Sequence, residues 1–99
     1  MITSGENHVF TNEERKTLSK FESSLKKQFD FSVDICIFTL CSIPPPLVEV
    51  ETWGYECKDQ KLLQKYAEET FPSGKWWWSW MGFYVDYPTL KQMVDSGTF

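Results

Sequence analysis

Two carboxylates, Glu49 and Glu51, have the type and spacing that acid–base chemistry could use. They stand two residues apart in a segment where apolar and polar residues alternate, so both would point to one face of a strand. A catalytic carboxylate pair needs an enclosed pocket that raises the pKa of one member, and the sequence shows no sign of a pocket. Charged side chains on a strand more often keep a sheet edge from pairing with other chains. We therefore expect no catalytic residue here, and either a solubilising role or contact with a basic partner.

His8 and the cysteines could in principle form a nucleophilic or metal site. His8 is the only histidine, and it lies in residues 1–10, which show no periodic pattern and are expected to form an irregular lead-in. With Cys36, Cys41 and Cys57 it would complete a set of zinc ligands. The spacing is not that of a zinc knuckle, and Cys36 falls inside a predicted strand, so we expect buried free thiols and no metal.

Cofactor and membrane signals are absent from the sequence. The five glycines are scattered singly and form no phosphate-binding loop, so no cofactor is expected. An odd number of cysteines behind a polar first segment predicts a reducing, cytoplasmic location. No apolar run approaches the roughly 20 residues of a membrane span, so no membrane partner is expected.

The run of aromatic residues around Trp76–Trp80 is the most unusual feature of the sequence. In an extended strand, Trp76, Trp78 and Trp80 would point one way and Trp77 the other. One interpretation is that helices cover both faces and every indole lies in the core. The other is that the row of three indoles, with Trp53 and Tyr55 and the two carboxylates, binds a partner. The candidate partner-binding residues are Trp76, Trp78, Trp80, Trp53, Tyr55, Glu49 and Glu51.

A third interpretation makes the indole row a stacking platform for single-stranded nucleic acid. Such platforms combine aromatic side chains with a basic groove that follows the backbone. Lys75 is the only base near the row, so the rest would have to come from Lys16, Lys20 and Lys27, on the basic face of the first predicted helix. The formal net charge of −4 argues against binding to duplex nucleic acid.

Helical patterns flank these residues. Thr11 and Glu14 have the spacing of a capping box for a helix that begins near Asn12 and presents one apolar stripe. That stripe consists of Leu18, Phe21, Leu25 and Phe29. A second helix is predicted from an N-cap at Asp59 to the turn at 71–74, with Leu62, Leu63, Tyr66, Ala67 and Thr70 along one side. A short last helix is predicted after an N-cap at Asp86.

Alternating patterns predict the strands. Residues 31–40 alternate, and since Phe38 and Leu40 on the second face are also apolar, we expect this strand to be covered on both sides towards its end. Pro44–Pro46 should end it and form an extended connector. Residues 47–55 form a second strand with an acidic outer face. Residues 75–87 are interpreted as one strand with a kink or bulge at Gly82, in preference to a hairpin turning at Met81 and Gly82.

These elements predict a small two-layer α+β domain that spans residues 1–99. Its order is α-β-β-α-β-α, with a three-stranded sheet, either antiparallel or mixed, and helices mainly on one face. The helix between the second and third strands could form a right-handed crossover that makes part of the sheet parallel.

Size and composition favour binding over catalysis. Small, acidic, aromatic-rich cytosolic domains without catalytic motifs include immunity proteins that neutralise toxins and phage-encoded inhibitors of host enzymes, an analogy of composition alone. We expect a non-enzymatic, protein-binding domain of this inhibitor or immunity type, whose partner is another protein with a basic surface. The alternative is a small module that binds single-stranded nucleic acid. The sequence leaves the oligomeric state open.

Overall fold

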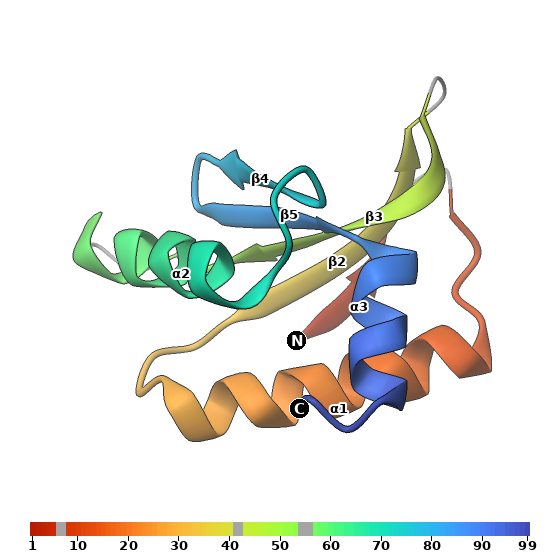
Figure 1. The fold of residues 1–99 in the computed structure, drawn as a ribbon, viewed down its shortest axis with the longest axis horizontal. Coiled ribbons are helices and arrows are strands. Elements are labelled where there is room, and N and C mark those ends of the chain that lie inside the picture. Colours follow the sequence, from red (N-terminus) through yellow and green to blue (C-terminus); the bar gives the residue numbers. More distant parts are fainter. Residues whose placement is uncertain (6–7, 41–42, 54–56) are drawn as a thin grey trace.

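The computed structural model describes residues 1–5, 8–40, 43–53 and 57–99, and it is an α+β domain with a mixed sheet, as predicted. Within these residues the sheet has five strands, so the prediction of three was wrong. The elements, in chain order (Figure 1), are β1 (Ile2–Ser4), α1 (Asn12–Gln28), β2 (Asp34–Leu40), β3 (Ile43–Glu51), α2 (Cys57–Thr70), β4 (Trp76–Ser79), β5 (Gly82–Asp86) and α3 (Tyr87–Asp95).

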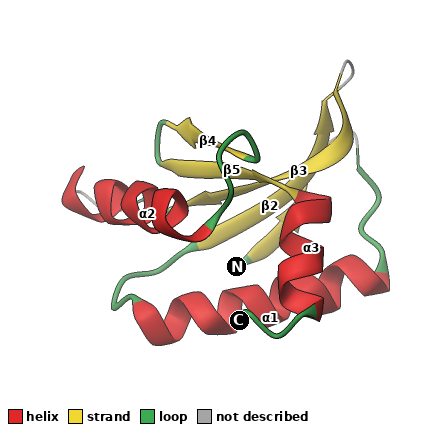
Figure 2. Ribbon diagram, viewed as in Figure 1, coloured by secondary structure: helices red, strands yellow, loops and turns green. Residues whose placement is uncertain are grey.

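The strands lie in the order β1-β2-β3-β5-β4 (Figure 2). Only β1 and β2 are parallel; the other neighbouring pairs are antiparallel. The parallel pair is therefore joined by α1, and not by the second helix as expected. The second helix, α2, connects β3 to β4, and β5 lies between these two strands.

The first strand was missed by the sequence analysis, which expected residues 1–10 to be irregular. Ile2, Thr3 and Ser4 pair with Ile35, Cys36 and Ile37 of β2. The pairing continues beyond β1, where the Gly5 N–H donates to the Ile37 carbonyl at 2.8 Å. Three residues are too few to show a period of two, so only the pairing with β2 defines this strand.

The interpretation of residues 75–87 as one strand was also wrong. They form the hairpin β4–β5, in which Ser79 pairs with Gly82 and the chain reverses at Trp80 and Met81. The usual two-residue turn needs residues with a positive φ, which was the reason for preferring one strand. Neither Trp80 nor Met81 has a positive φ, so the turn of this hairpin is of another type. Its turn lies one residue earlier than the hairpin that the sequence analysis considered.

The prolines do not form a separate connector, because β3 begins at Ile43 and includes them. An extended polyproline backbone has φ and ψ angles close to those of a strand, so it can continue one. The ladder with β2 is regular from Asp34 to Phe38 and shifts register between Phe38 and Leu40. Strand β2 ends at Leu40, before the prolines as expected.

All three helices contribute to one core on a single face of the sheet (Figure 1). The capping box of α1 is present, and Leu18, Phe21 and Leu25 are fully buried as predicted, with Phe29 only partly buried. Asp86 caps α3 as predicted. The sheet contributes Ile35, Ile37, Val48, Val50, Phe83 and Val85.

Helix α2 differs in two respects from its prediction. It begins at Cys57, so Asp59 lies in its first turn and not at its N-cap. Leu63, Tyr66 and Ala67 are buried as expected, but Leu62 is 45% exposed.

Candidate functional site

The sheet face opposite the helices, called the open face below, carries one cross-strand row over all five strands. Its register runs from Thr3 on β1 through Cys36, Glu49 and Tyr84 to Trp77 on β4. The core residues of β2, β3 and β5 alternate with these positions, so the row points away from the helices. No helix in the described part of the chain contributes to this face.

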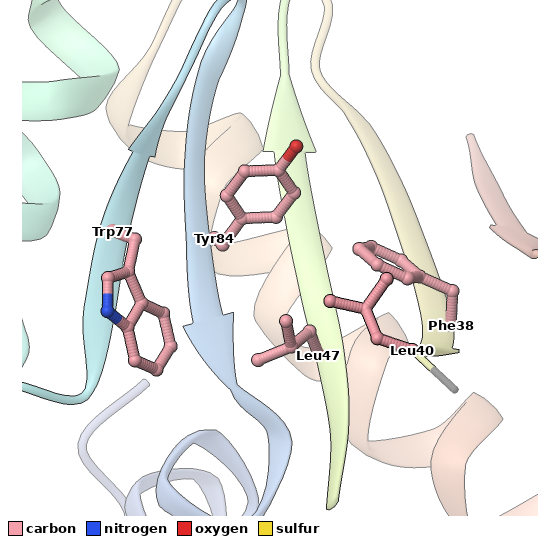
Figure 3. A pocket seen from close by; sticks show the side chains of 5 residues that line it. All are labelled: Phe38, Leu40, Leu47, Trp77 and Tyr84. Carbon is pink, nitrogen blue, oxygen red and sulfur yellow. The ribbon is translucent and has the colours of Figure 1, made fainter. Parts of the chain in front are cut away.

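One end of the open face is an apolar hollow of about 400 Å³. Figure 3 shows its lining side chains around a shared space, contributed by four strands. The Phe38 and Tyr84 rings meet edge to face with centroids 6.0 Å apart, and Trp77 is 45% exposed. The apolar hollow is lined by Phe38, Leu40, Leu47, Trp77 and Tyr84. Its size and aromatic lining suit an apolar side chain, with the Tyr84 hydroxyl as a polar group nearby.

Next to the hollow lies an acidic cluster made of Asp34, Glu49 and Glu51. Asp34 pairs in register with Glu51, and Glu49 lies between Cys36 and Tyr84. Burial raises the pKa of the Glu51 carboxyl, and the negative charge of Glu49 raises it further. The Asp34 carboxylate lies 3.5 Å from the N-terminal ammonium of Met1, whereas none of the ion pairs between described residues involves Glu49 or Glu51.

Glu49 also affects the groups on either side of it. The pKa of the Tyr84 hydroxyl is raised by burial, by the charge of Glu49 and by the hydrogen bond that it donates to Glu49. Burial is also the main cause that raises the pKa of the Cys36 thiol, and both glutamates add to it. A thiol with a raised pKa stays protonated at neutral pH and is a weak nucleophile. This arrangement is suited to binding a basic group and not to thiolate chemistry.

The structure separates the predicted indole row. Trp76 is partly buried against the core, Trp78 is 68% exposed on the helix side, and Trp80 is 93% exposed in the turn after β4. The hairpin reverses the chain at Trp80, so the three indoles do not continue along one strand. The interpretation in which every indole is buried is equally wrong, because Trp53, Trp77, Trp78 and Trp80 are exposed.

Trp77 is the correction that matters most for the site. The sequence analysis placed it on the face opposite the row of three indoles. In the structure it lines the apolar hollow on the open face. Trp53 is 67% exposed, and its indole N–H donates to Glu51 Oε1 at 3.2 Å. Tyr55 lies outside the described residues.

The sequence did contain a signal for the hollow. The apolar character of Phe38 and Leu40 on the second face of β2 predicted that something covers this end of the strand. In the structure Leu40 is 40% exposed, and both side chains line the hollow. No described helix covers them on the open face, so the expectation of cover on both sides was wrong. Leu47 and Tyr84 were not singled out, because each is one apolar position in an alternating strand.

His8 lies in the irregular segment before α1, as expected, but its side chain is held in place. Its Nε2 is 2.7 Å from Glu14 Oε2 and its Nδ1 is 3.2 Å from Thr39 Oγ1. Glu14 also accepts the Thr11 N–H through Oε1, so His8 connects the capping box of α1 to β2. The described residues contain no group of three that could hold a metal ion.

The thiols are only partly as expected. Cys36 is half-buried, but Cys57 is exposed at the start of α2, so the prediction of burial was wrong for it. Cys41 lies outside the described residues.

The basic face of α1 lies far from the indoles of β4. Helix α1 packs against β1 and α3, while α2 packs against β3, β5 and β4. Figure 1 shows α1 at the bottom of the molecule and β4 at the top. Lys16 and Lys20 instead border a second, mixed-charge hollow, in which Lys91 Nζ lies 2.9 Å from Glu13 Oε1 and 2.6 Å from Asp95 Oδ2.

Comparison of the chain with protein-family models, with curated proteins and with solved structures gives no match. Within the described residues, none of the helices combines the length and the apolar character needed to cross a bilayer.

Proposed function

We propose that this chain is a protein-binding domain of the inhibitor or immunity type, which receives its partner on the open face. The observation that carries the proposal is an apolar, aromatic hollow beside an acidic cluster, on a sheet face that no described helix covers. The proposal keeps Glu49, Glu51 and Trp53 from the predicted site and adds Phe38, Leu40, Leu47, Trp77 and Tyr84.

The hollow would supply most of the affinity. Tryptophan and tyrosine are favoured anchors at protein interfaces, because each combines a large apolar surface with one polar group. Burying an exposed aliphatic or aromatic side chain contributes about 25 cal/mol per Å² of apolar area removed from water. A partner that inserts an apolar side chain between Trp77 and Leu40 would gain from both of these exposed residues.

The acidic cluster would select the partner. Burial and the charge of Glu49 both raise the pKa of Glu51, and a lysine or arginine placed over the two carboxylates would offset both effects. Complementary charge also speeds the encounter between partners. The open face therefore suits a protein that presents an apolar side chain next to a basic one.

The arrangement gives the nucleic-acid alternative less support. Its aromatic part lies on β4, and its basic part lies on α1 at the other end of the sheet order, next to β1. A strand of nucleic acid that stacks on Trp78 would not meet Lys16, Lys20 and Lys27 on one continuous surface.

Two matched leucines allow a direct test. Leu40 lines the hollow and is 40% exposed, whereas Leu62 on α2 is 45% exposed and lies away from the open face. Tagged wild type, Leu40→Asp and Leu62→Asp are used to capture proteins from a lysate of the source cells, with and without nuclease. We expect a stoichiometric partner with wild type and Leu62→Asp and its loss with Leu40→Asp. A partner that both variants retain, or recovery that requires nucleic acid, would overturn the proposal.

A further inference from the structure

Strand β4 is the last strand of the sheet, and no described strand lies beyond it. The Lys75 carbonyl accepts the Asp86 N–H at 2.9 Å, so this carbonyl points towards β5, while the Lys75 N–H donates to the Pro72 carbonyl at 3.1 Å. Because backbone groups alternate along an antiparallel strand, those of Trp77 also point towards β5. At the end of the strand the Ser79 carbonyl accepts a hydrogen bond from the Gln64 side chain of α2 at 3.2 Å. The N–H and C=O groups of Trp76 and Trp78 therefore point outward, where another strand could pair with them.

Two of the usual protections against pairing are missing from this edge. Edge strands are normally protected by charged side chains, by proline or by a covering element. Residues 76–79 contain neither a charge nor a proline. Exposed indoles also lie on both sides of the strand, with Trp77 45% exposed on the open face and Trp78 68% exposed on the helix side. A strand added beside β4 would cover both indoles at once.

The edge is complementary to itself. If two β4 strands run antiparallel with Trp77 opposite Trp77, the outward groups of Trp76 in each copy meet those of Trp78 in the other. Moving the register by two residues would bring in Gly74 or the turn residue Trp80, and fewer hydrogen bonds would form. Residues 70–85 contain no Asp or Glu, although the chain carries a net charge of −4, and Lys75 would lie opposite Ser79. Two copies can therefore approach here without carboxylate repulsion.

We propose that the occupant of this edge is a second copy of the chain, paired through β4 about a two-fold axis at Trp77. The two sheets then form one continuous sheet, and the two apolar hollows lie on the same side of it, next to the axis. The pairing uses the edge of β4 and goes beyond the proposed function, which concerns the open face.

The size of the contact predicts a concentration-dependent dimer. The exposed parts of Trp77 and Trp78 together amount to about one whole indole side chain per copy. Such a side chain buries roughly 150–250 Å², whereas a standard interface buries about 800 Å² per partner. Backbone pairing adds to this area, but we expect monomer at low concentration and dimer at high concentration.

Cysteine cross-linking tests the register. Residues that face each other as a non-hydrogen-bonded pair have Cα atoms about 4.5 Å apart, which a disulfide can bridge. In a background with the three native cysteines replaced by serine, Trp77→Cys should form a covalent dimer under mild oxidation. Trp80→Cys, at a position that is 93% exposed but lies in the turn, should form it at least about tenfold more slowly. Equal rates at the two positions would overturn the register.

Analytical ultracentrifugation over a wide concentration range tests the dimer itself. Trp78→Pro removes an outward N–H at an edge position where proline is tolerated, and Trp78→Lys introduces a charge into the contact. Either variant should be monomeric where the wild type is dimeric, while Trp80→Lys should still dimerise. Circular dichroism shows whether each of the two Trp78 variants has folded. If one of them has not, the other is used to test the dimer. The proposal is overturned if the wild type stays monomeric or if the dimer survives Trp78→Lys. It is also overturned if the dimer is lost with Leu40→Asp, because the contact would then involve the apolar hollow and not the edge of β4.

Discussion

Gly82 on β5 lies so close to Val50 on β3 that a Cβ atom at position 82 would be 1.9 Å from the Val50 carbonyl oxygen. The contact involves backbone atoms of two central strands, so a rotamer change cannot relieve it. Gly82 also pairs with Ser79 at the end of the β4–β5 hairpin. It therefore allows the hairpin to turn while keeping β5 against β3.

We predict that Gly82→Ala destabilises the protein by about 3 kcal/mol, the upper end of the usual cost of overpacking, because the strands must separate to admit the methyl group. Gly74→Ala is the matched control. Gly74 has a φ of 84° and nothing within 4 Å of an added Cβ, so only backbone strain of about 1 to 2 kcal/mol is expected. Urea unfolding measures both values. A Gly82→Ala variant as stable as Gly74→Ala would contradict the close approach.

His8 should stabilise the fold through its bonds to Glu14 and Thr39. We predict that His8→Ala lowers the free energy of unfolding by about 1 to 3 kcal/mol, because it leaves the buried Glu14 carboxylate without one partner. Glu13→Ala, at an exposed position on the same turn, should change it far less. Equal stability of His8→Ala and wild type in urea would show that these bonds contribute nothing.

Glu51 should make the protein less stable as the pH rises. Its folded pKa is raised, so the folded state binds more protons than the unfolded state, and stability falls as the pH rises through the pKa of the unfolded chain and up to the folded one. Glu51→Gln keeps an oxygen acceptor for the Trp53 indole and removes the charge. We predict that it stabilises the protein at neutral pH, by less than about 1 kcal/mol because the site is partly exposed, and has no effect at acid pH.

The same Glu51→Gln variant should bind a basic partner more weakly. A gain in stability together with a loss of affinity separates the role of Glu51 in recognition from any role in folding. If unfolding at neutral pH shows no change or a loss of stability, burial and the charge of Glu49 do not disfavour the charged Glu51 carboxylate as we infer.

Tyr66 should make the protein sensitive to alkaline pH. Burial raises the pKa of its hydroxyl to about 12. The unfolded chain ionises from about pH 10, so stability should fall between pH 10 and 12 and level off above that range. Two pKa units correspond to about 2 to 3 kcal/mol. Tyr66→Phe should remove this part of the slope, and absorbance of the phenolate should show one fewer late-titrating tyrosine. An unchanged slope would contradict the burial of the hydroxyl.

The sequence by itself determined the elements whose signals are local. The capping box at Thr11 and Glu14, the stripe of Leu18, Phe21 and Leu25, and the cap at Asp86 were predicted and are present. The alternation that places Glu49 and Glu51 on the same face, away from Val48 and Val50, was also predicted correctly. Each of these signals involves residues within a few positions of one another.

The tertiary structure decided how these elements pair and which side chains remain exposed. Strand β1 exists because β2 pairs with it, and the hairpin at Trp80 and Met81 exists because β5 pairs with both β3 and β4. The site depends on the same long-range contacts. Trp77 and Phe38 line a hollow because all three helices pack on the other face of the sheet, so the open face lies where no described helix covers it. A residue's type and spacing determine which face it occupies, but only the packing of distant segments determines whether that face is covered.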